Sequence, residues 1–265
     1  MEVVAYLASA LIGISLGLVG GGGSILTVPV LVYLFGISPL LATSYSLFIV
    51  GSTSLVGAFQ NYRNGLVQVK IALLFGMSSV TTVWLSRKFL IPAIPEHIAS
   101  FAHFELTERM LMMSLFALLM LIAAIAMIRS GRAQTAEPSV ANEDLNYAKL
   151  LLYGIGIGLT TGLLGAGGGF LLIPTLVLLV GLSMKEAIGT SLFIIALNSL
   201  IGFSGDFGHF NIDWIFLLKI TMIAITGIFI GGYLSKRLNG KKLKIGFGWF
   251  VLVMGIYILT KELFF

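Results

Sequence analysis

Long apolar runs separated by short polar stretches make up most of the sequence. The runs lie at 3–19, 24–35, 39–59, 66–85, 110–128, 147–164, 169–180, 185–204, 212–234 and 243–259. A helix that spans a bilayer needs roughly 20 apolar residues. The pattern therefore predicts an all-α polytopic membrane protein. Its predicted parts are a first transmembrane repeat at 1–130, a polar linker at 131–146 and a second repeat at 147–265.

The composition narrows the classes of protein further. Hydrophobic residues make up 58% of the chain and charged residues only 10%. Soluble globular proteins carry about 25% charged residues, so a soluble enzyme is excluded. The chain has no cysteine, which excludes a disulfide scaffold and thiolate chemistry. The net charge of +5 comes from basic residues in short loops, which indicates an orientation signal rather than a nucleic-acid partner.

The two units are related by an internal duplication. Residues 13–59 align with residues 158–204 at a constant offset of 145. The identical positions include glycine, proline and serine, which shared hydrophobicity alone does not explain. Examples are Gly17/Gly162, Gly20/Gly165, Gly23/Gly168, Pro29/Pro174, Gly36/Gly181, Ser46/Ser191 and Ser54/Ser199. Internal repeats of this kind are typical of secondary transporters.

Two of the apolar runs are too short to cross a membrane. A helix over 24–35 or 169–180 rises about 18 Å, whereas the hydrocarbon core is roughly 30 Å thick. Glycine clusters at 20–23 and 165–169 precede these runs. Each glycine destabilises a helix by about 1 kcal/mol relative to alanine. We therefore expect a hairpin broken within the membrane in each half, with Ser24 and Gly169 opening the second helix of each hairpin.

The topology follows from counting crossings. One hairpin and three spanning helices give each half an odd number of crossings, so the two halves are predicted to be inverted repeats. A cytoplasmic linker at 131–146 places most loop lysines and arginines inside, as the positive-inside rule requires, and both termini outside. The expected location is the cell inner (plasma) membrane. Parallel halves with four crossings each remain an alternative.

Particular motifs in both halves resemble the sulfite exporter TauE/SafE family. They are GLVGGGGSILTVPVLVYLFG with the following LATSYSLFIV, and GLTTGLLGAGGGFLLIPTLVLLVGLSMKEAIGTSLFII. The resemblance implies a transporter of sulfite, sulfonates or related small anions that is coupled to the proton motive force.

The chain also departs from this family pattern, and each departure makes the two halves chemically unequal. Tyr45 stands where the second half has Thr190. Gly227 and Gly231 form a close-packing motif whose first-half places are expected at Ser78 and Thr82.

Helix ends inside the membrane and the nearby hydroxyls are the candidate substrate site. Free N–H groups at a helix N-terminus attract anions, and uncharged donors allow the anion to leave again. The candidate residues are Gly21, Gly22, Gly23, Ser24, Thr43, Ser44, Ser46, Gly167, Gly168, Gly169, Thr190, Ser191 and Asn198. The alternative is that the glycines only permit close helix packing and the hydroxyls only bond neighbouring helices.

A few charged residues are further candidates. Arg63 is either an anion contact or an ordinary loop arginine. Asp206 and His209 either relay protons or belong to an unremarkable loop. Lys219, within an apolar run, either serves proton coupling or extends its amine to the membrane surface.

The predicted function is a secondary transporter, in the exporting direction, of small anions such as sulfite, sulfonates or related organic anions. It would work by alternating access around a midplane site at the glycine breaks. Since the apolar runs carry almost no titratable groups, no catalytic residue, metal site or cofactor is expected, and an enzyme is disfavoured. The expected partners are the anion and the lipid bilayer, and a homodimer is left open. An anion channel of the same architecture and a transporter of a non-sulfur substrate are the alternatives.

Overall fold

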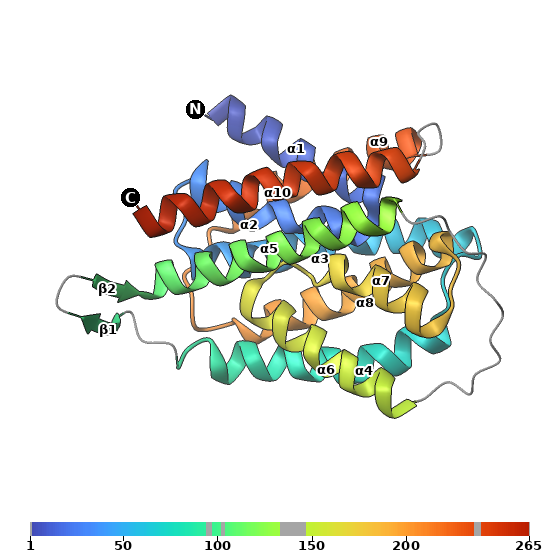
Figure 1. Ribbon diagram of the computed structural model, residues 1–265, viewed down its shortest axis with the longest axis horizontal. Helices are drawn as coiled ribbons and strands as arrows, with labels where there is room; N and C mark the ends of the chain where they lie inside the picture. The colour runs from blue at the N-terminus through green and yellow to red at the C-terminus, as the bar shows by residue number, and fades with distance from the viewer. Residues whose placement is uncertain (1, 94–96, 102–103, 133–146, 236–239, 265) are drawn as a thin grey trace.

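Helices form almost all of the described chain (Figure 1). The computed structural model describes residues 2–93, 97–101, 104–132, 147–235 and 240–264. The first half contains α1 (Glu2–Val19), the 3-10 helix η1 (Gly20–Leu26), α2 (Thr27–Tyr33), α3 (Pro39–Arg63), α4 (Val69–Leu85), the π-helical turn η2 (Ser86–Leu90), β1 (His97–Phe101), β2 (Phe104–Thr107) and α5 (Glu108–Arg132). The second half contains α6 (Tyr147–Leu164), α7 (Gly169–Val180), α8 (Met184–Gly205), α9 (Trp214–Ser235) and α10 (Gly240–Phe264).

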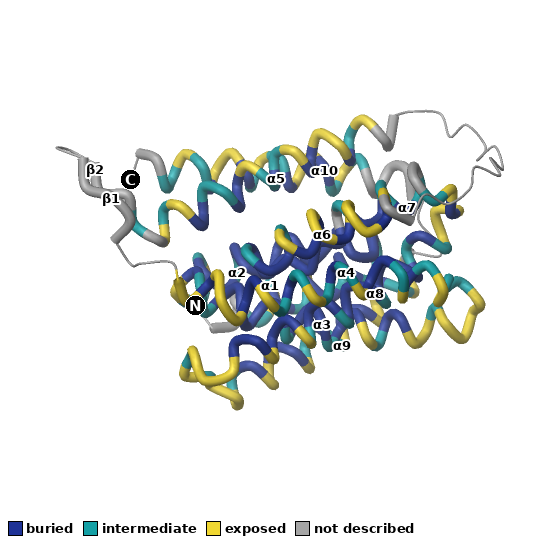
Figure 2. The backbone as a smooth tube through the Cα atoms, turned by 90° about the horizontal axis from the view of Figure 1, so that it is seen from below, coloured by how far each residue is buried: buried dark blue, intermediate teal, exposed yellow. Residues whose placement is uncertain are grey.

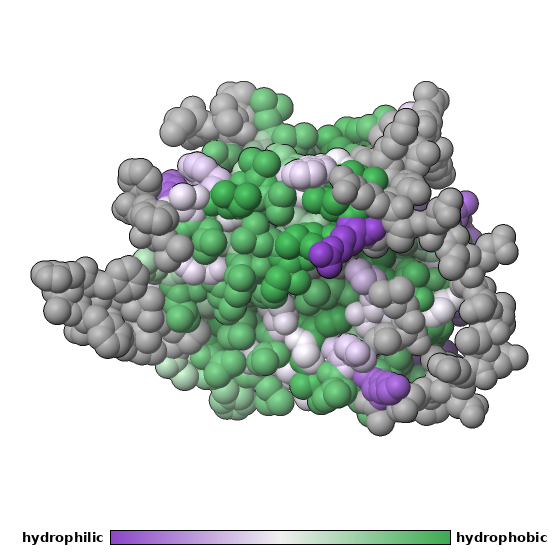
Figure 3. Space-filling model, viewed as in Figure 1, coloured by the Kyte–Doolittle hydropathy of each residue, from purple (hydrophilic) through white to green (hydrophobic). Residues whose placement is uncertain are grey.

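Seven helical stretches of the described residues are long and apolar enough to cross a membrane. By length and composition they are Tyr6–Tyr33, Pro39–Arg63, Val69–Leu90, Arg109–Arg129, Met184–Gly205, Trp214–Leu234 and Ile245–Glu262. The first of them contains α1, η1 and α2 and turns back on itself at Gly20. Figure 3 shows hydrophobic side chains over most of the described part of one face, as expected of a surface that contacts lipid. The predicted helical membrane architecture is confirmed, and a short antiparallel hairpin of β1 and β2 before α5 is added to it.

Each half packs mainly against the other half. α1 lies along α9, and the equivalent helix α6 lies along α4. Glycines permit both contacts: a Cβ atom on Gly13 would overlap the carbonyl of Ala224, and one on Gly158 would lie 2.6 Å from the carbonyl oxygen of Ser79. Residues 13 and 158 differ by the repeat offset, as do residues 79 and 224. The duplication in the sequence is therefore repeated in the packing.

The same contacts correct one predicted match between the halves. Gly227 and Gly231 both pack against α1, and the residues that pack against α6 in the equivalent way are Thr82 and Ser86. Thr82 and Ser86 are therefore the first-half counterparts, and the match of this pair to Ser78 and Thr82 was wrong. The two glycines serve a contact within the chain, so they lend no support to a homodimer, which stays a prediction.

The central helices α3 and α8 occupy equivalent places in the repeat and run antiparallel. Gly51 lies against Leu200 and Gly57 against Leu192, so the residue numbers of the contacts fall along α8 as they rise along α3. α5 and α10 are likewise antiparallel, because Gly248 contacts the end of α5 and Gly255 its middle. Figure 2 shows these two helices as a layer beside the bundle, while buried residues concentrate in α1, η1, α2, α3 and α8.

The first broken segment is a hairpin with its tip at the glycines. The rings of Tyr6, near the start of α1, and Phe35, just after α2, lie 6.3 Å apart between centroids. Gly20 turns the chain with φ of 68°, and Gly165 does so at the equivalent place with φ of 66°. Such angles suit only glycine, so the turn is fixed by residue type.

The prediction for the start of the second hairpin helix is right in one half and wrong in the other. α7 begins at Gly169, as predicted. In the first half the glycines form the 3-10 helix η1, Ser24 lies inside it, and α2 begins only at Thr27. All seven residues of η1 are buried. Tertiary packing therefore outweighs the poor helix propensity of glycine.

The two ends of the bundle are distinct in Figure 1. Both chain termini lie at the end that carries β1 and β2, and the last residues of α5 and the first of α6 lie at the opposite end. Except for its first two residues, which continue α5, the predicted linker at 131–146 is outside the described residues.

Two alanine substitutions in α6 test the close packing of the halves. Gly158→Ala is expected to lower the free energy of unfolding by about 1–3 kcal/mol, because its methyl group would overlap the backbone of α4. Gly156→Ala is the matched control, since nothing lies within 4 Å of its Cβ position. Thermal unfolding in detergent measures both. Equal melting temperatures for the two variants would contradict the contact between α4 and α6.

Candidate functional site

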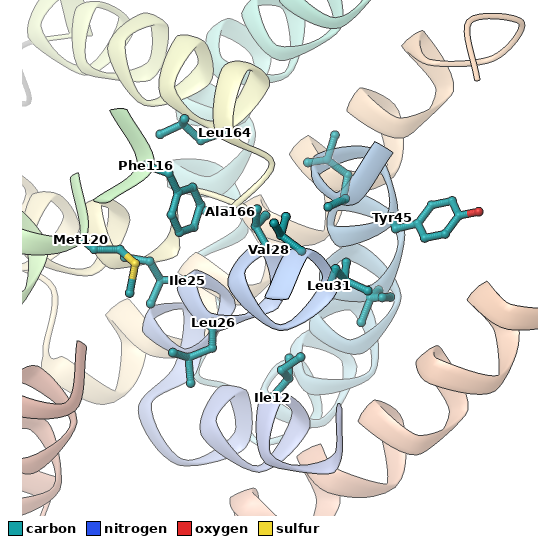
Figure 4. Packing of buried hydrophobic residues seen from close by; sticks show 14 of the residues in the cluster. Ile12, Ile25, Leu26, Val28, Leu31, Tyr45, Phe116, Met120, Leu164 and Ala166 are labelled. Atoms are coloured by element: carbon teal, nitrogen blue, oxygen red, sulfur yellow. The ribbon is translucent and has the colours of Figure 1, made fainter. Parts of the chain in front are cut away.

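The two glycine turns meet in the centre of the protein. A Cβ atom on Gly169 would overlap the backbone of Gly21, and one on Gly21 would lie 2.7 Å from the Cα of Gly169. Figure 4 shows Ile25 and Ala166, from the two turns, in one buried cluster with Phe116 of α5. The two predicted breaks therefore meet in the fold, and their position at the bilayer midplane stays a prediction.

At this meeting point, two of the predicted hydroxyls donate hydrogen bonds to backbone carbonyls. Ser24 donates to the carbonyl of Gly21 at 2.8 Å and also to the carbonyl of Ala166. Ser46 donates to the carbonyl of Gly165 at 2.7 Å. These bonds join the turn of the second half to η1 and α3. For these two serines the geometry fits the alternative in which hydroxyls bond neighbouring helices.

The start of α7 has buried donors that are not occupied. Gly168 caps α7 without a side-chain hydrogen bond. The hydroxyls of Thr161 and Ser199 are fully buried, have no hydrogen-bond partner and lie beside Gly168 and Gly167, respectively. The amide nitrogen of Asn198 also lacks a partner, while its oxygen accepts a bond from Ser79 at 2.8 Å. Free donors beside a helix N-terminus form an electropositive site of the kind that binds anions.

A buried ion pair lies close to this turn. Arg87 in η2 and Asp206 at the end of α8 both have 0% of their side chains exposed, and Arg87 Nη1 lies 3.4 Å from Asp206 Oδ2. The same nitrogen donates to Thr43 Oγ1 at 3.0 Å. Thr43 packs through its backbone against Gly165. Thr43 therefore connects the ion pair to the glycine turn of the second half.

Half of this ion pair escaped the sequence analysis. Asp206 was a candidate, but Arg87 was not among the candidate residues. The repeat contained the missing signal, because the residue 145 positions after Arg87 is Gly232, which lies in the last turn of the helix α9. The equivalent of Asp206 is Asn61. Asn61 and Gly232, which stand in the places of Asp206 and Arg87 in the other half, are both uncharged. The ion pair therefore has no counterpart in the other half of the repeat.

Competing effects act on the carboxyl group of Asp206. Burial raises its pKa above the ordinary value, whereas the charge of Arg87, the Ser44 hydroxyl and the charge of His209 lower it. Burial is the largest of these influences. The protonated form of Asp206 is therefore easier to reach than that of an exposed aspartate.

Two equivalent hydrogen bonds link the halves at opposite ends. The hydroxyl of Tyr45 accepts a bond from the backbone N–H of Asp213 at 2.7 Å. The hydroxyl of Thr190 accepts one from the backbone N–H of Gln68 at 3.0 Å. Both donors immediately precede or cap the next long helix, and both residue pairs are related by the offset of 145. Tyr45 therefore performs the same bonding as Thr190, although the residue types differ.

A comparison with known families agrees with this geometry. Residues 5–258 match the model of the family described as sulfite exporter TauE/SafE. The chain belongs to the TauE/SafE family. Together with its seven long apolar helices, this places it among multi-pass membrane transporters.

Relatives of this family member cover nearly the whole chain. A probable membrane transporter protein of Xylella fastidiosa (strain 9a5c) is 28% identical over 264 residues, covering 98% of this chain and 95% of its own. The probable membrane transporter protein YdhB of Bacillus subtilis is 30% identical over 221 residues, covering 83% of this chain and 85% of its own. No solved structure is significantly similar to this chain.

The remaining predicted residues of this TauE/SafE protein are either buried in its helices or exposed at its surface. Gly22 and Gly23 are buried in η1, and Ser191 donates to the carbonyl of Ile188 at 2.9 Å. Arg63 is exposed at the end of α3, where its guanidinium carbon lies 5.9 Å from the Phe59 ring centroid.

Two other charged candidates are also exposed. His209 lies on the turn after Asp206. Lys219 lies on α9 and lines a surface groove of about 450 Å³ with Tyr6, Leu218, Met222 and Ile223. Among the described residues, no group of three His, Asp or Glu side chains could hold a metal ion.

Neutralising the ion pair tests its contribution to stability. Arg87→Gln leaves the Asp206 carboxylate buried without its counter-charge and is expected to lower the free energy of unfolding by about 3–5 kcal/mol. The double variant Arg87→Gln/Asp206→Asn contains no buried charge and should recover most of this loss. Unfolding in detergent measures both, with Arg63→Gln as an exposed arginine control. A double variant no more stable than Arg87→Gln would contradict a direct interaction.

Proposed function

We propose that this protein is a secondary transporter that moves small anions across the inner membrane by alternating access. The single observation that supports this most is the start of α7, where unpartnered Thr161 and Ser199 hydroxyls surround an uncapped helix N-terminus. The positive end of the helix dipole and several neutral donors attract an oxyanion.

The fold supports an inverted arrangement of the two halves. Equivalent helices would be parallel if the halves had the same orientation, whereas α3 and α8, and also α5 and α10, are antiparallel. In inverted-repeat transporters the substrate site lies at the interface of the halves near the bilayer midplane. We place the linker in the cytoplasm and both termini outside, because that arrangement follows the positive-inside rule.

The substrate class comes from family membership. The family description names sulfite export, so sulfite, sulfonates and related organic anions are the proposed substrates and export is the proposed direction. A channel would show flux that does not saturate with concentration, whereas a carrier would saturate. A substrate outside the sulfur oxyanions would leave the architecture unchanged and alter only which anion binds.

Ligand-induced stabilisation tests the anion site. Purified protein is titrated with sulfite, sulfoacetate, sulfate, thiosulfate and acetate while the melting temperature is followed. A ligand at 100 times its dissociation constant stabilises by about 2.7 kcal/mol, so at least one sulfur oxyanion should raise the melting temperature by several degrees. Thr161→Val is expected to weaken that anion's affinity about tenfold, because it removes a charge-attracting donor. Thr160→Val is the matched control, since the Thr160 hydroxyl is exposed and bonds to Gly156.

Flux in proteoliposomes tests transport itself. Labelled sulfite or sulfoacetate should exchange across the vesicle membrane with a rate that saturates, and Thr161→Val should require more substrate to reach half the maximal rate. Flux that rises linearly with concentration would favour the channel. No flux of any anion in the panel would overturn the proposed function.

A further inference from the structure

We propose that the free edge of the Arg87 guanidinium binds the anion and that Asp206 takes up a proton when it does so. This inference rests on the proposed function, and it assigns a binding residue and a coupled proton to it.

The hydrogen bonding of Arg87 leaves one edge of the guanidinium without a partner. All of its polar contacts involve Nη1, which faces Thr43 and Asp206. Nε and Nη2 are buried and have no partner. These two nitrogens lie on the same edge of the planar group and point in parallel, which is the geometry that binds two oxygens of a carboxylate, sulfonate or sulfite. Buried guanidinium donors without a partner are costly, so a ligand that fills this edge is stabilised.

The charge balance of the site explains the proton. Arg87 and Asp206 are together neutral, so a monoanion on the free edge gives the buried site a net charge of −1. A negative charge in a buried site is strongly disfavoured unless it is compensated. One proton on the Asp206 carboxylate restores neutrality, and Oδ1 is the oxygen to receive it, because Oδ2 faces Arg87. One anion and one proton therefore bind together, with no other group changing charge.

The surroundings of Asp206 single it out as the group that titrates. From α3 it is faced by the neutral side chains of Thr43 and Ser44, and from η2 by Arg87. Its own loop contributes His209, whose side chain is exposed and whose charge is felt by the carboxyl. Lys88 is also exposed, with its amine 4.5 Å from the Trp84 ring centroid. Burial raises the pKa of the Asp206 carboxyl and so favours its protonated form.

The other half of the repeat has no such pair. Asn61 stands in the place of Asp206, and its amide donates to the carbonyl of Gly57 at 2.8 Å. Gly232 stands in the place of Arg87. Each chain therefore has one proton-linked anion site from this pair of positions, connected through Thr43 to the glycine turn at Gly165. Movement of a monoanion with one proton is electroneutral, so the two concentration gradients set its direction.

Binding of methanesulfonate as a function of pH tests the inference. Methanesulfonate stays monoanionic between about pH 6 and about pH 8, so only the protein titrates. Because anion binding raises the pKa of Asp206, the wild-type affinity should increase as the pH falls, by up to tenfold per pH unit. The affinity levels off below the pKa of Asp206 in the anion-free protein. In weakly buffered solution, anion binding should also remove protons from the medium.

Particular variants separate the roles. Asp206→Asn should bind methanesulfonate at least as tightly as the wild type does at low pH, with no pH dependence and no proton uptake. Arg87→Lys should weaken binding by more than about tenfold at every pH, because an ammonium cannot replace the two-nitrogen edge. The double variant Arg87→Gln/Asp206→Asn, which keeps the site neutral, should fold and fail to bind. His209→Gln should keep the proton uptake, with the pH dependence displaced to higher pH because the charge of His209 lowers the pKa of Asp206, and Lys88→Gln should match the wild type in all respects.

The outcomes distinguish this inference from the proposed function. An unchanged pH dependence in Asp206→Asn, or tight binding by the neutral double variant, overturns the inference while transport by the wild type still supports the transporter. Loss of the pH dependence in His209→Gln would assign the proton to the histidine and also overturn it. If wild-type protein neither binds methanesulfonate nor moves any anion of the panel, both proposals fail.

Discussion

The close approach of the two glycine turns is the contact on which the rest of the fold depends. Gly21 and Gly169 come from opposite halves and touch through their backbones, which no residue with a Cβ atom permits. Because irregular backbone inside a membrane survives only when protein covers it, each turn needs the other half as its cover. The crossed packing of α1 on α9 and of α6 on α4 supplies this cover. Neither half has an equivalent partner within itself, so the two halves are expected to fold together.

The backbones of the two halves make equivalent contacts, whereas some of their side chains differ. Tyr45 and Thr190 differ in size, yet each accepts a bond from the backbone that begins the next long helix. Arg87 and Asp206, in contrast, occupy places that hold Gly232 and Asn61 in the other half. The two halves therefore share one backbone arrangement, but only one of the two equivalent places contains an ion pair. Such inequality is what a transporter needs if a proton and its substrate are to be handled differently at the two sides of the membrane.

Burial of polar groups without partners connects the fold to the proposed chemistry. Membrane helices usually satisfy serine and threonine hydroxyls with carbonyls of the preceding turn, and Ser46 and Ser24 bond to carbonyls across the interface. The Thr161 and Ser199 hydroxyls and two Arg87 nitrogens do not follow this pattern. Thr161 and Ser199 lie beside Gly168 and Gly167, respectively, and Arg87 is connected to Gly165 of the same turn through Thr43. The proposed anion site depends on these unpartnered donors.

The sequence alone determined the helical membrane class, the duplicated halves, the hairpin glycines and the start of α7 at Gly169. These follow from local causes: apolar run length, the repeat offset and the need for glycine where φ is positive. It misplaced Ser24 at a helix start, because burial of η1 outweighs helix propensity there. Only the tertiary structure decided that Arg87 belongs with Asp206 and that Thr161 and Ser199 keep free hydroxyls. The partners of a polar side chain come from distant helices, and no local pattern in the chain specifies which carbonyls or charges those helices bring within reach.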